Sequence, residues 1–177
     1  MTLDGKCDHT VSNADDELHR HFTELLRSSD TVLYGRITYQ LMESFWPGVA
    51  ASPTGNKTLD EFALAMEGIT KVVFSRTLRA VTWKTARLAQ RDPAAEVEDL
   101  RRQPGGDILV GSRSLIVSLM NLGLIDELQL CVHAIIAGKG LPLFENIAGR
   151  TDLKLIKTKT LSLGTMALYY EVGTLGA

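Results

Sequence analysis

Cysteine and histidine are scarce in this sequence, which argues against disulfide-based or metal-based structures. The 177 residues include two cysteines, Cys7 and Cys131, whose spacing fits neither a metal motif nor a C-x-x-C pair. We interpret them as reduced thiols of a cytoplasmic protein, because oxidised pairs are typical of secreted proteins. The four histidines are scattered, and His19 and His21 cannot share one face of a helix. No metal site is therefore expected.

The sequence also has no excess of one charge and no long apolar run. A net charge of −2 argues against nucleic-acid binding by phosphate neutralisation. No stretch approaches the length of a membrane span, and the N-terminus has no apolar signal core. Hydrophobic residues at 45% and charged residues at 23% are instead typical of a globular protein. We expect one domain over residues 1–177, long enough to bury its own core.

Hydrophobic periodicity predicts strands that alternate with helices, followed by a tail of strands. The predicted helices are 15–27, with a start at 13–16, then 38–45, 57–67, 93–102, and one that follows Gly111 and ends at Gly123. The predicted strands are 31–34, 71–74, 108–110 and 127–136, with a closing antiparallel hairpin of 153–161 and 165–172. Residues 46–56 read as a loop, because Trp46-Pro47-Gly48 interrupts the helical pattern. This order predicts an α/β sandwich with a mixed sheet.

Three of the predicted strand ends carry glycine, hydroxyl or arginine residues. They are Gly35, Arg36 and Thr38 after the first strand, Ser75 and Arg76 after the second, and Gly111, Ser112, Arg113 and Ser114 after the third. Helix starts with free N–H groups, together with arginines, favour phosphate binding. Three such ends at one sheet edge would suit a phosphorylated dinucleotide, with two helix starts on the pyrophosphate and an arginine on a ribose phosphate.

A plainer interpretation of the same residues stays open. The hydroxyls could only cap helices, and the arginines could only be solvated or paired with acids. The G-x-G-x-x-G fingerprint and the Walker pattern are both absent, which excludes a typical Rossmann domain and a P-loop.

Several segments together resemble the dihydrofolate reductase-like superfamily, and within it the branch of the riboflavin-biosynthesis reductase domain (RibD C-terminal domain). The segments are Thr2-Leu3-Asp4-Gly5, 34–39, 73–77, 108–114, and 123–128 continuing to His133 and 138–144. The resemblance covers nearly the whole chain. It implies a three-layer sandwich of the dihydrofolate reductase type, with a mixed, mainly parallel sheet flanked by helices. The last of these segments is fairly specific to the riboflavin-reductase branch.

The resemblance implies an NADPH-dependent reductase that is a homodimer. Its two glycine turns, Gly35 to Thr38 and Gly111 to Ser114, would face the cofactor phosphates. Ser75 and Arg76 would meet the 2′-phosphate, and Asp4 and Gly5 would lie near the nicotinamide and the substrate, with Asp4 as the candidate catalytic residue. The implied substrate is a small pyrimidine- or pterin-like heterocycle, and the closest specified reaction is reduction of 5-amino-6-(5-phosphoribosylamino)uracil. The alternative is a non-catalytic nucleotide- or ligand-binding protein that retains the fold.

The sequence departs from the family pattern in three places. Ser112 stands where the family usually has the second of two glycines, which predicts an altered or lost cofactor affinity. The first strand expected upstream of Thr2 is missing, so we expect the natural start to lie further upstream, the alternative being a shortened strand. Asp16 and Glu17 are the nearest candidates for the acid that dihydrofolate reductases place beside the pterin, but we interpret them as charges of a helix N-terminus.

Two further residues have two interpretations each. Trp46 could form a wall of the substrate pocket or could only pack at a helix end. His133 could donate a proton in the site or could be a structural hydrogen-bonding residue of a strand.

Overall fold

The computed structural model describes residues 1–7 and 14–173. It divides into two compact units, which we describe one at a time. The central unit is Leu18–Leu115, and the terminal unit combines Met1–Glu17 with Ile116–Ala177. The expected helix start at Asn13 lies outside the described residues.

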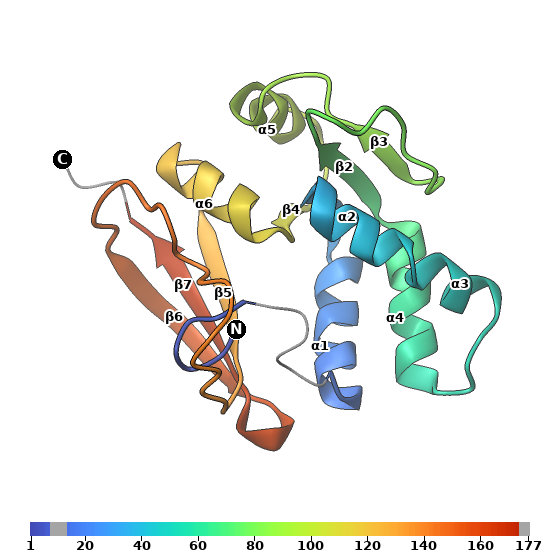
Figure 1. The fold of residues 1–177 in the computed structure, drawn as a ribbon, viewed down its shortest axis with the longest axis horizontal. Coiled ribbons are helices and arrows are strands. Elements are labelled where there is room, and N and C mark those ends of the chain that lie inside the picture. The colour runs from blue at the N-terminus through green and yellow to red at the C-terminus, as the bar shows by residue number, and fades with distance from the viewer. Residues whose placement is uncertain (8–13, 174–177) are drawn as a thin grey trace. The chain divides into compact units, whose positions relative to one another are not determined.

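The central unit is built on a parallel sheet of four strands. These are β1 (Ser29–Gly35), β2 (Thr70–Phe74), β3 (Ala86–Leu88) and β4 (Asp107–Val110). Their order is β3-β2-β1-β4, and all neighbouring pairs are parallel (Figure 1). In β1, Leu33 is opposite Val72 on one side and Val110 on the other. A central strand of a parallel sheet is buried on both faces and therefore contains a continuous apolar run, and this run made β1 predictable from the sequence.

Five helices lie wholly or mostly in the central unit, and a sixth crosses its boundary. They are α1 (Asp16–Arg27), α2 (Arg36–Glu43), α3 (Trp46–Ala51), α4 (Lys57–Gly68), α5 (Pro93–Arg101) and α6 (Arg113–Asn121). The side chain of Asn56 caps α4 by accepting from Leu59 N, and Asp92 caps α5 in the same manner. The core beneath them includes Tyr34, Tyr39 and Met66, all at most 5% exposed.

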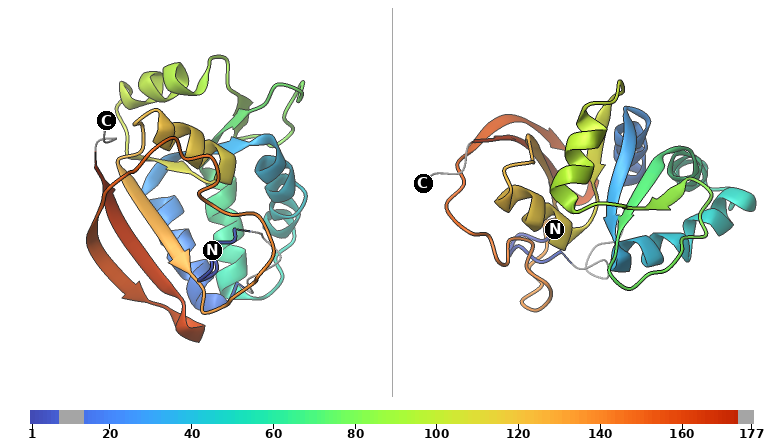
Figure 2. Two further views of the ribbon diagram at one scale, coloured as in Figure 1. Left: turned by 60° about the vertical axis from the view of Figure 1, so that its left-hand side comes forward. Right: turned by 90° about the horizontal axis from the view of Figure 1, so that it is seen from above.

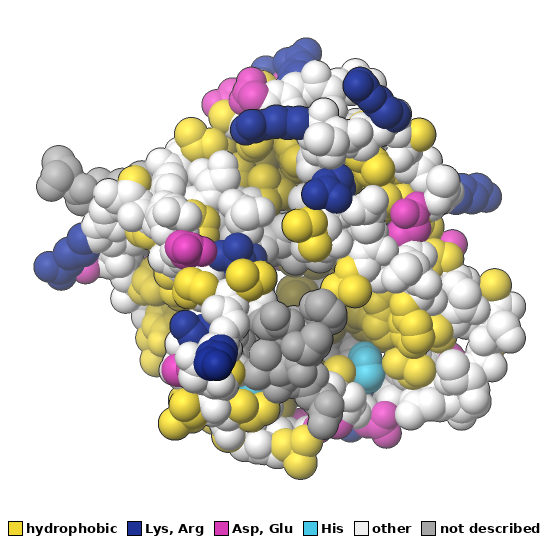
Figure 3. All heavy atoms as spheres, viewed as in Figure 1, with side chains coloured by type: hydrophobic (Ala, Val, Ile, Leu, Met, Phe, Trp, Pro, Cys, Tyr) yellow, Lys and Arg dark blue, Asp and Glu magenta, His cyan; other side chains and the backbone are white. Residues whose placement is uncertain are grey.

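The structure corrects the interpretation of residues 46–56 as a loop. Trp46–Ala51 forms α3, with Pro47 in its first turn, where a proline costs no helical hydrogen bond. Hydrophobic side chains gather over α3 and α4 on the face drawn in Figure 3. Helix α2 also begins two residues before the expected residue 38, directly after β1. The strand β3 was not expected at all.

The terminal unit contains an antiparallel sheet of three strands. These are β5 (Glu127–Val132), β6 (Leu153–Thr160) and β7 (Met166–Val172), in the order β5-β7-β6 (Figure 2). The hairpin of β6 and β7 confirms the expected closing hairpin, and a short 3-10 turn (Ser162–Gly164) joins the two strands. Strand β5 ends at Val132, four residues before the expected end, and Thr2 pairs with His133 beyond it in an isolated parallel bridge.

The end of α6 follows from a glycine, as the sequence indicated. Gly123 has a φ of 67°, its N–H donates to Met120 O, and Leu124 N donates to Leu119 O. This is the Schellman arrangement, in which glycine relieves the strain of a left-handed residue. The α/β class, the parallel sheet and the C-terminal antiparallel hairpin are thus confirmed, with the antiparallel strands forming a sheet of their own. None of the helices in the described ranges is long and apolar enough to span a bilayer.

Candidate functional site

A pocket of about 310 Å³ opens at the carboxyl ends of β1 and β2 in the central unit. It is lined by Gly35, Arg36, Ile37, Thr38, Phe74, Ser75, Arg76, Thr77 and Ser114. Six of the residues that the sequence suggested for cofactor phosphates are among them: Gly35, Arg36, Thr38, Ser75, Arg76 and Ser114. The structure therefore brings parts of all three predicted strand ends to one place.

The pocket lies where the strand order of the sheet reverses. The chain moves from β1 to β2 and β3 on one side, and then returns to place β4 on the other side of β1. In open α/β sheets, ligands bind outside the carboxyl ends of the strands at such a switch point. Here β1 continues directly into α2, and β4 is joined to α6 by the two residues Gly111 and Ser112.

The first turn of α2 forms one wall of the pocket. Gly35 precedes the helix, and no side chain caps it. The first N–H groups of a helix have no partner within the helix, and they form the positive end of the helix dipole. Arg36, Ile37 and Thr38 hold these N–H groups, and all three residues line the pocket. This wall is suited to an anion.

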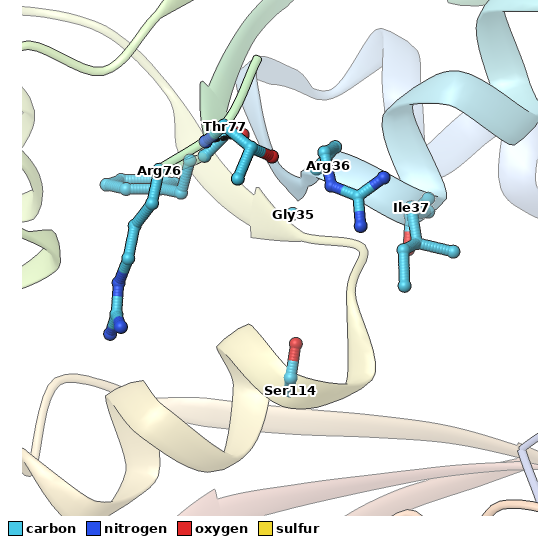
Figure 4. A pocket seen from close by; sticks show the side chains of 9 residues that line it. Gly35, Arg36, Ile37, Arg76, Thr77 and Ser114 are labelled. Atoms are coloured by element: carbon cyan, nitrogen blue, oxygen red, sulfur yellow. Dashed lines mark hydrogen bonds between the residues drawn. The ribbon is translucent and has the colours of Figure 1, made fainter.

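Polar side chains complete the pocket. The Arg36 guanidinium and the hydroxyls of Thr77 and Ser114 point toward the same space, while Arg76 extends from the other side (Figure 4). Arg36 Nη1 donates to Gln40 Oε1 at 3.1 Å, which supports its guanidinium from the same helix. Ser75 Oγ accepts from Thr77 N at 3.1 Å and from Leu78 N at 2.8 Å, so it shapes the loop that carries Arg76. The described lining residues include two arginines and no acid.

Three of the residues suggested for the cofactor are not among those that line the pocket: Gly111, Ser112 and Arg113. Ser112 is 2% exposed, and its Oγ accepts the N–H of Gly35 at 2.8 Å. Its backbone is not strained, since Asn146 and Leu163 are the non-glycine residues with positive φ in the described part of the chain. A Cβ on Gly111 would lie 2.4 Å from Tyr34 Cε1, so this glycine is needed for packing.

Asp4 and Gly5 belong to the terminal unit, where Asp4 holds a turn together. Its carboxylate accepts from Thr2 Oγ1 at 2.6 Å, Ala137 N at 3.1 Å and Gly138 N at 2.8 Å. The Thr2 hydroxyl and these backbone donors lower the pKa of Asp4 to about 2. A group with this pKa is ionised at neutral pH and is poorly suited to supply a proton.

Trp46 lies in an aromatic cluster of the central unit. Its ring centroid is 4.5 Å from that of Phe62, 5.0 Å from Phe45 and 6.1 Å from His19. Trp46 Nε1 donates to Met42 Sδ at 3.2 Å. Trp46 and Phe62 also pack against the core around Tyr34, which supports the structural interpretation of Trp46. Phe45 is 52% exposed, so part of this aromatic cluster lies at the surface. Both interpretations of Trp46 stay open, because an aromatic surface can also hold a planar ring.

The remaining candidates have structural partners in the terminal unit. His133 is buried, and its Nδ1 lies 3.2 Å from Thr165 Oγ1. Burial, with the nearby N-terminal charge, lowers the pKa of His133, which favours a neutral structural imidazole. Asp16 and Glu17 lie in the first turn of α1, and Glu17 Oε2 accepts from Ser162 N at 2.7 Å. In residues 1–7 and 14–173, no cluster of His, Cys, Asp and Glu is suited to a metal ion.

Three of the lining residues are not among those suggested for the cofactor: Ile37, Phe74 and Thr77. Thr77 does carry a sequence signal, because the strand end Ser75-Arg76-Thr77 places a hydroxyl on each side of a cation, which suits a phosphate. Ile37 and Phe74 have no such signal. They line the pocket because of their positions in the helix and the strand, and not because of their chemistry.

Comparisons with known proteins identify the family. The model of the RibD C-terminal domain family matches residues 1–167. The chain belongs to the RibD C-terminal domain family. Membership supports a reductase-type function in general terms. A protein of Bacillus subtilis (strain 168), the uncharacterized protein YyaP, is 36% identical over 151 residues, which cover 85% of this chain and 78% of that protein.

Solved structures support the same fold. A putative riboflavin biosynthesis protein from Shewanella sp. PV-4 has a TM-score of 0.73 at 19% identity, with 97% of this chain and 94% of that chain covered. The bifunctional deaminase and 5-amino-6-(5-phosphoribosylamino)uracil reductase of Thermotoga maritima has a TM-score of 0.62 at 19% identity, with 96% of this chain covered. This chain spans 54% of that longer protein. At these identities the likeness concerns the fold.

Proposed function

We propose that this protein is an NADPH-dependent reductase of a small heterocyclic substrate. The observation that supports this most is the pocket at the switch point, where uncapped N–H groups of α2, two arginines and four residues with hydroxyl groups line one space. This donor set fits the phosphates of a dinucleotide, because each group donates to an anion and none repels it. The family supplies the second support, since the Thermotoga relative is a reductase.

The proposal assigns separate tasks to the residues of the pocket. The N–H groups of Arg36, Ile37 and Thr38 bind the pyrophosphate, with help from the hydroxyl of Ser114. Arg76, next to the Ser75 turn, binds the 2′-phosphate that distinguishes NADPH from NADH. The cofactor itself supplies the hydride when it is bound. The protein contributes binding, orientation and the exclusion of water.

For the substrate, we propose a pyrimidine- or pterin-like ring, closest to 5-amino-6-(5-phosphoribosylamino)uracil. The aromatic cluster of Trp46, Phe45, Phe62 and His19 offers a surface on which a planar ring can pack. A small carbonyl compound is the simpler alternative within the same reaction class.

A non-catalytic nucleotide-binding protein is the second candidate function. The observation that favours it concerns Asp4, the acid suggested for catalysis, whose three hydrogen bonds keep it ionised. The described lining residues of the pocket also include no His, Cys, Asp or Glu that could move a proton. This candidate predicts NADPH binding without oxidation in the presence of any heterocycle.

The first test is a titration of the protein with NADPH and with NADH, followed by quenching of tryptophan fluorescence. Arg76→Ala should weaken NADPH binding about tenfold and NADH binding much less, because a charge-assisted hydrogen bond to the 2′-phosphate is lost. Arg79→Ala is the matched control, since Arg79 is exposed in the same loop and does not line the pocket.

Two results would contradict the proposal. An equal loss of NADPH and NADH affinity in Arg76→Ala would mean that Arg76 does not read the 2′-phosphate. A folded wild-type protein that binds neither nucleotide would exclude the nucleotide-dependent functions. If NADPH binds, pyrimidines, pterins and small carbonyls are then screened for loss of the NADPH absorbance. Loss of absorbance with one of them indicates the reductase, and binding without any loss indicates the non-catalytic binding protein.

A further inference from the structure

The side chain of Ser112 connects the two turns that flank the switch point. Ser112 directly precedes α6, and Gly35 directly precedes α2. Ser112 Oγ accepts the N–H of Gly35 at 2.8 Å, across 77 positions of the sequence. The residue is 2% exposed and does not line the pocket. It therefore has a position behind the pocket wall and not on its surface.

This hydrogen bond takes the place of a rung of the parallel sheet. Gly111 N donates to Leu33 O at 3.0 Å, which continues the backbone ladder between β1 and β4. Beyond it the two chains turn into helices, and the next donor of β1, Gly35 N–H, goes to a hydroxyl and not to a carbonyl. A partly buried N–H without an acceptor is unfavourable, so the hydroxyl both satisfies Gly35 and joins the diverging turns.

The two turns that Ser112 joins each contribute to the pocket. Gly35 begins the segment that provides the N–H groups of α2, and Ser114 follows Ser112 by two residues. They also pack closely, because a Cβ on Gly35 would lie 3.7 Å from Ser112 Cβ and 3.9 Å from Ser114 Oγ. A change in the Ser112 contact would therefore alter the spacing between the α2 wall and Ser114.

We infer that Ser112 is a positioning residue, which sets the spacing of the phosphate-binding turns without touching the ligand. The inference rests on the proposed function, since it concerns the same pocket. In the competing view, the hydroxyl occupies a donor that a phosphate would otherwise use. The geometry argues against that view, because Gly35 N–H is a strand donor directed to β4, whereas the donors of α2 are those of Arg36, Ile37 and Thr38.

The test compares three variants in two measurements. Ser112→Ala removes the acceptor, Ser112→Thr keeps the hydroxyl, and Ser44→Ala is a control at an exposed serine whose Oγ donates to Leu41 O. The measurements are the amide hydrogen exchange of Gly35 without ligand and the dissociation constant of NADPH. Inorganic pyrophosphate is titrated in parallel, because its binding needs the phosphate crevice and no reductase activity.

Ser112→Ala should raise the exchange rate of Gly35 and the dissociation constants of NADPH and pyrophosphate by about tenfold, as expected for one lost hydrogen bond. Ser112→Thr should restore all three values, and Ser44→Ala should change none. Unchanged or tighter binding by a folded Ser112→Ala variant would overturn the inference. A serine with a purely structural role would lower the melting temperature and leave these affinities unchanged.

The proposed function can fail separately. Pyrophosphate binding without NADPH binding by the wild type would contradict the reductase. The role of Ser112 would then be tested by comparing the pyrophosphate affinities of its variants with that of the wild type. If the wild type binds neither probe, both proposals are wrong.

Discussion

At the scale of single residues, two glycines that look equivalent in the sequence differ in how much their surroundings require a residue without a side chain. Gly35 and Gly111 each follow an apolar strand and precede a helix, and neither has a positive φ. A Cβ on Gly35 would make ordinary contacts at 3.7 Å, whereas a Cβ on Gly111 would lie 2.4 Å from Tyr34 Cε1. The sequence could predict the turns but not this difference, because it depends on where the Tyr34 ring lies.

The two glycines therefore predict different responses to alanine. Gly111→Ala should lower the free energy of unfolding by about 1–3 kcal/mol, because the buried Tyr34 ring must move in a packed core. Gly35→Ala should change it by less than about 0.5 kcal/mol, since the loss at the helix start and the gain from a stiffer unfolded chain nearly cancel. Urea unfolding followed by tryptophan fluorescence measures both. Equal destabilisation would show that the Tyr34 contact does not explain Gly111.

At the scale of secondary-structure elements, the sequence predicted those with a strong hydrophobic pattern and missed those without one. β1, β2 and β4 each contain a short continuous apolar run, and α1 and α4 have a clear apolar stripe. β3 has three residues of intermediate burial and no alternation to detect. α3 has the sequence WPGVAA, in which proline and glycine signal a break, although the proline fits the first turn.

A buried lysine of β2 contacts the end of α4 and the segment that precedes β3, and it does not line the pocket. Lys71 in β2 is 0% exposed. Its Nζ donates to Met66 O, to Ile69 O at 2.8 Å and to Thr85 Oγ1 at 2.7 Å, and lies 4.1 Å from the centroid of the Trp83 ring. The two carbonyls come from the end of α4, where the helix dipole favours a cation. The side chain thus connects the end of α4 to the segment that leads into β3.

Burial of Lys71 predicts a pH dependence of stability. Desolvation lowers its pKa from 10.5 to about 8. Between pH 8 and 10.5 the unfolded chain binds more protons than the folded one, so the free energy of unfolding should rise with pH, by about 2 kcal/mol at pH 9.5 relative to pH 7. Below pH 8 both states are protonated and the slope vanishes.

Urea unfolding at several pH values measures this slope, with two variants for comparison. Lys71→Met should abolish the rise, and Lys84→Met should keep it, because Lys84 is exposed. A rise of the same size in Lys71→Met would assign it to other titrating groups.

At the scale of the whole molecule, sequence reasoning suggested the strand ends that contribute to the pocket but not their roles. It placed Ser112 on the phosphates because the residue stands in a glycine-rich turn. Its burial follows from the register of β1 against β4, which joins residues 77 positions apart and has no local signal. The residue types of each turn could therefore be predicted to suit a phosphate, whereas the contact between Ser112 and Gly35 could not be predicted.

The sequence also predicted a single domain, and the two compact units provide a way to test it. Helices α1 and α6 each run across a boundary between the units without interruption. Because a helix forms cooperatively, we expect the units to unfold together. Both tryptophans, Trp46 and Trp83, lie in the central unit, so fluorescence follows that unit alone, whereas far-UV circular dichroism follows both.

Thermal unfolding should therefore give the same midpoint by the two methods, and NADPH should raise both midpoints equally by its binding to the folded state. Two midpoints, with NADPH raising only the one seen by fluorescence, would show that the central unit folds alone and that the single-domain prediction is wrong.

The same scans at several protein concentrations test the expected homodimer, because an assembly stabilises its folded subunits and raises both midpoints with concentration. A midpoint independent of concentration, together with the mass of one chain in light scattering, would contradict the dimer. It would not affect the pocket, because all of its described lining residues lie in the central unit of one chain.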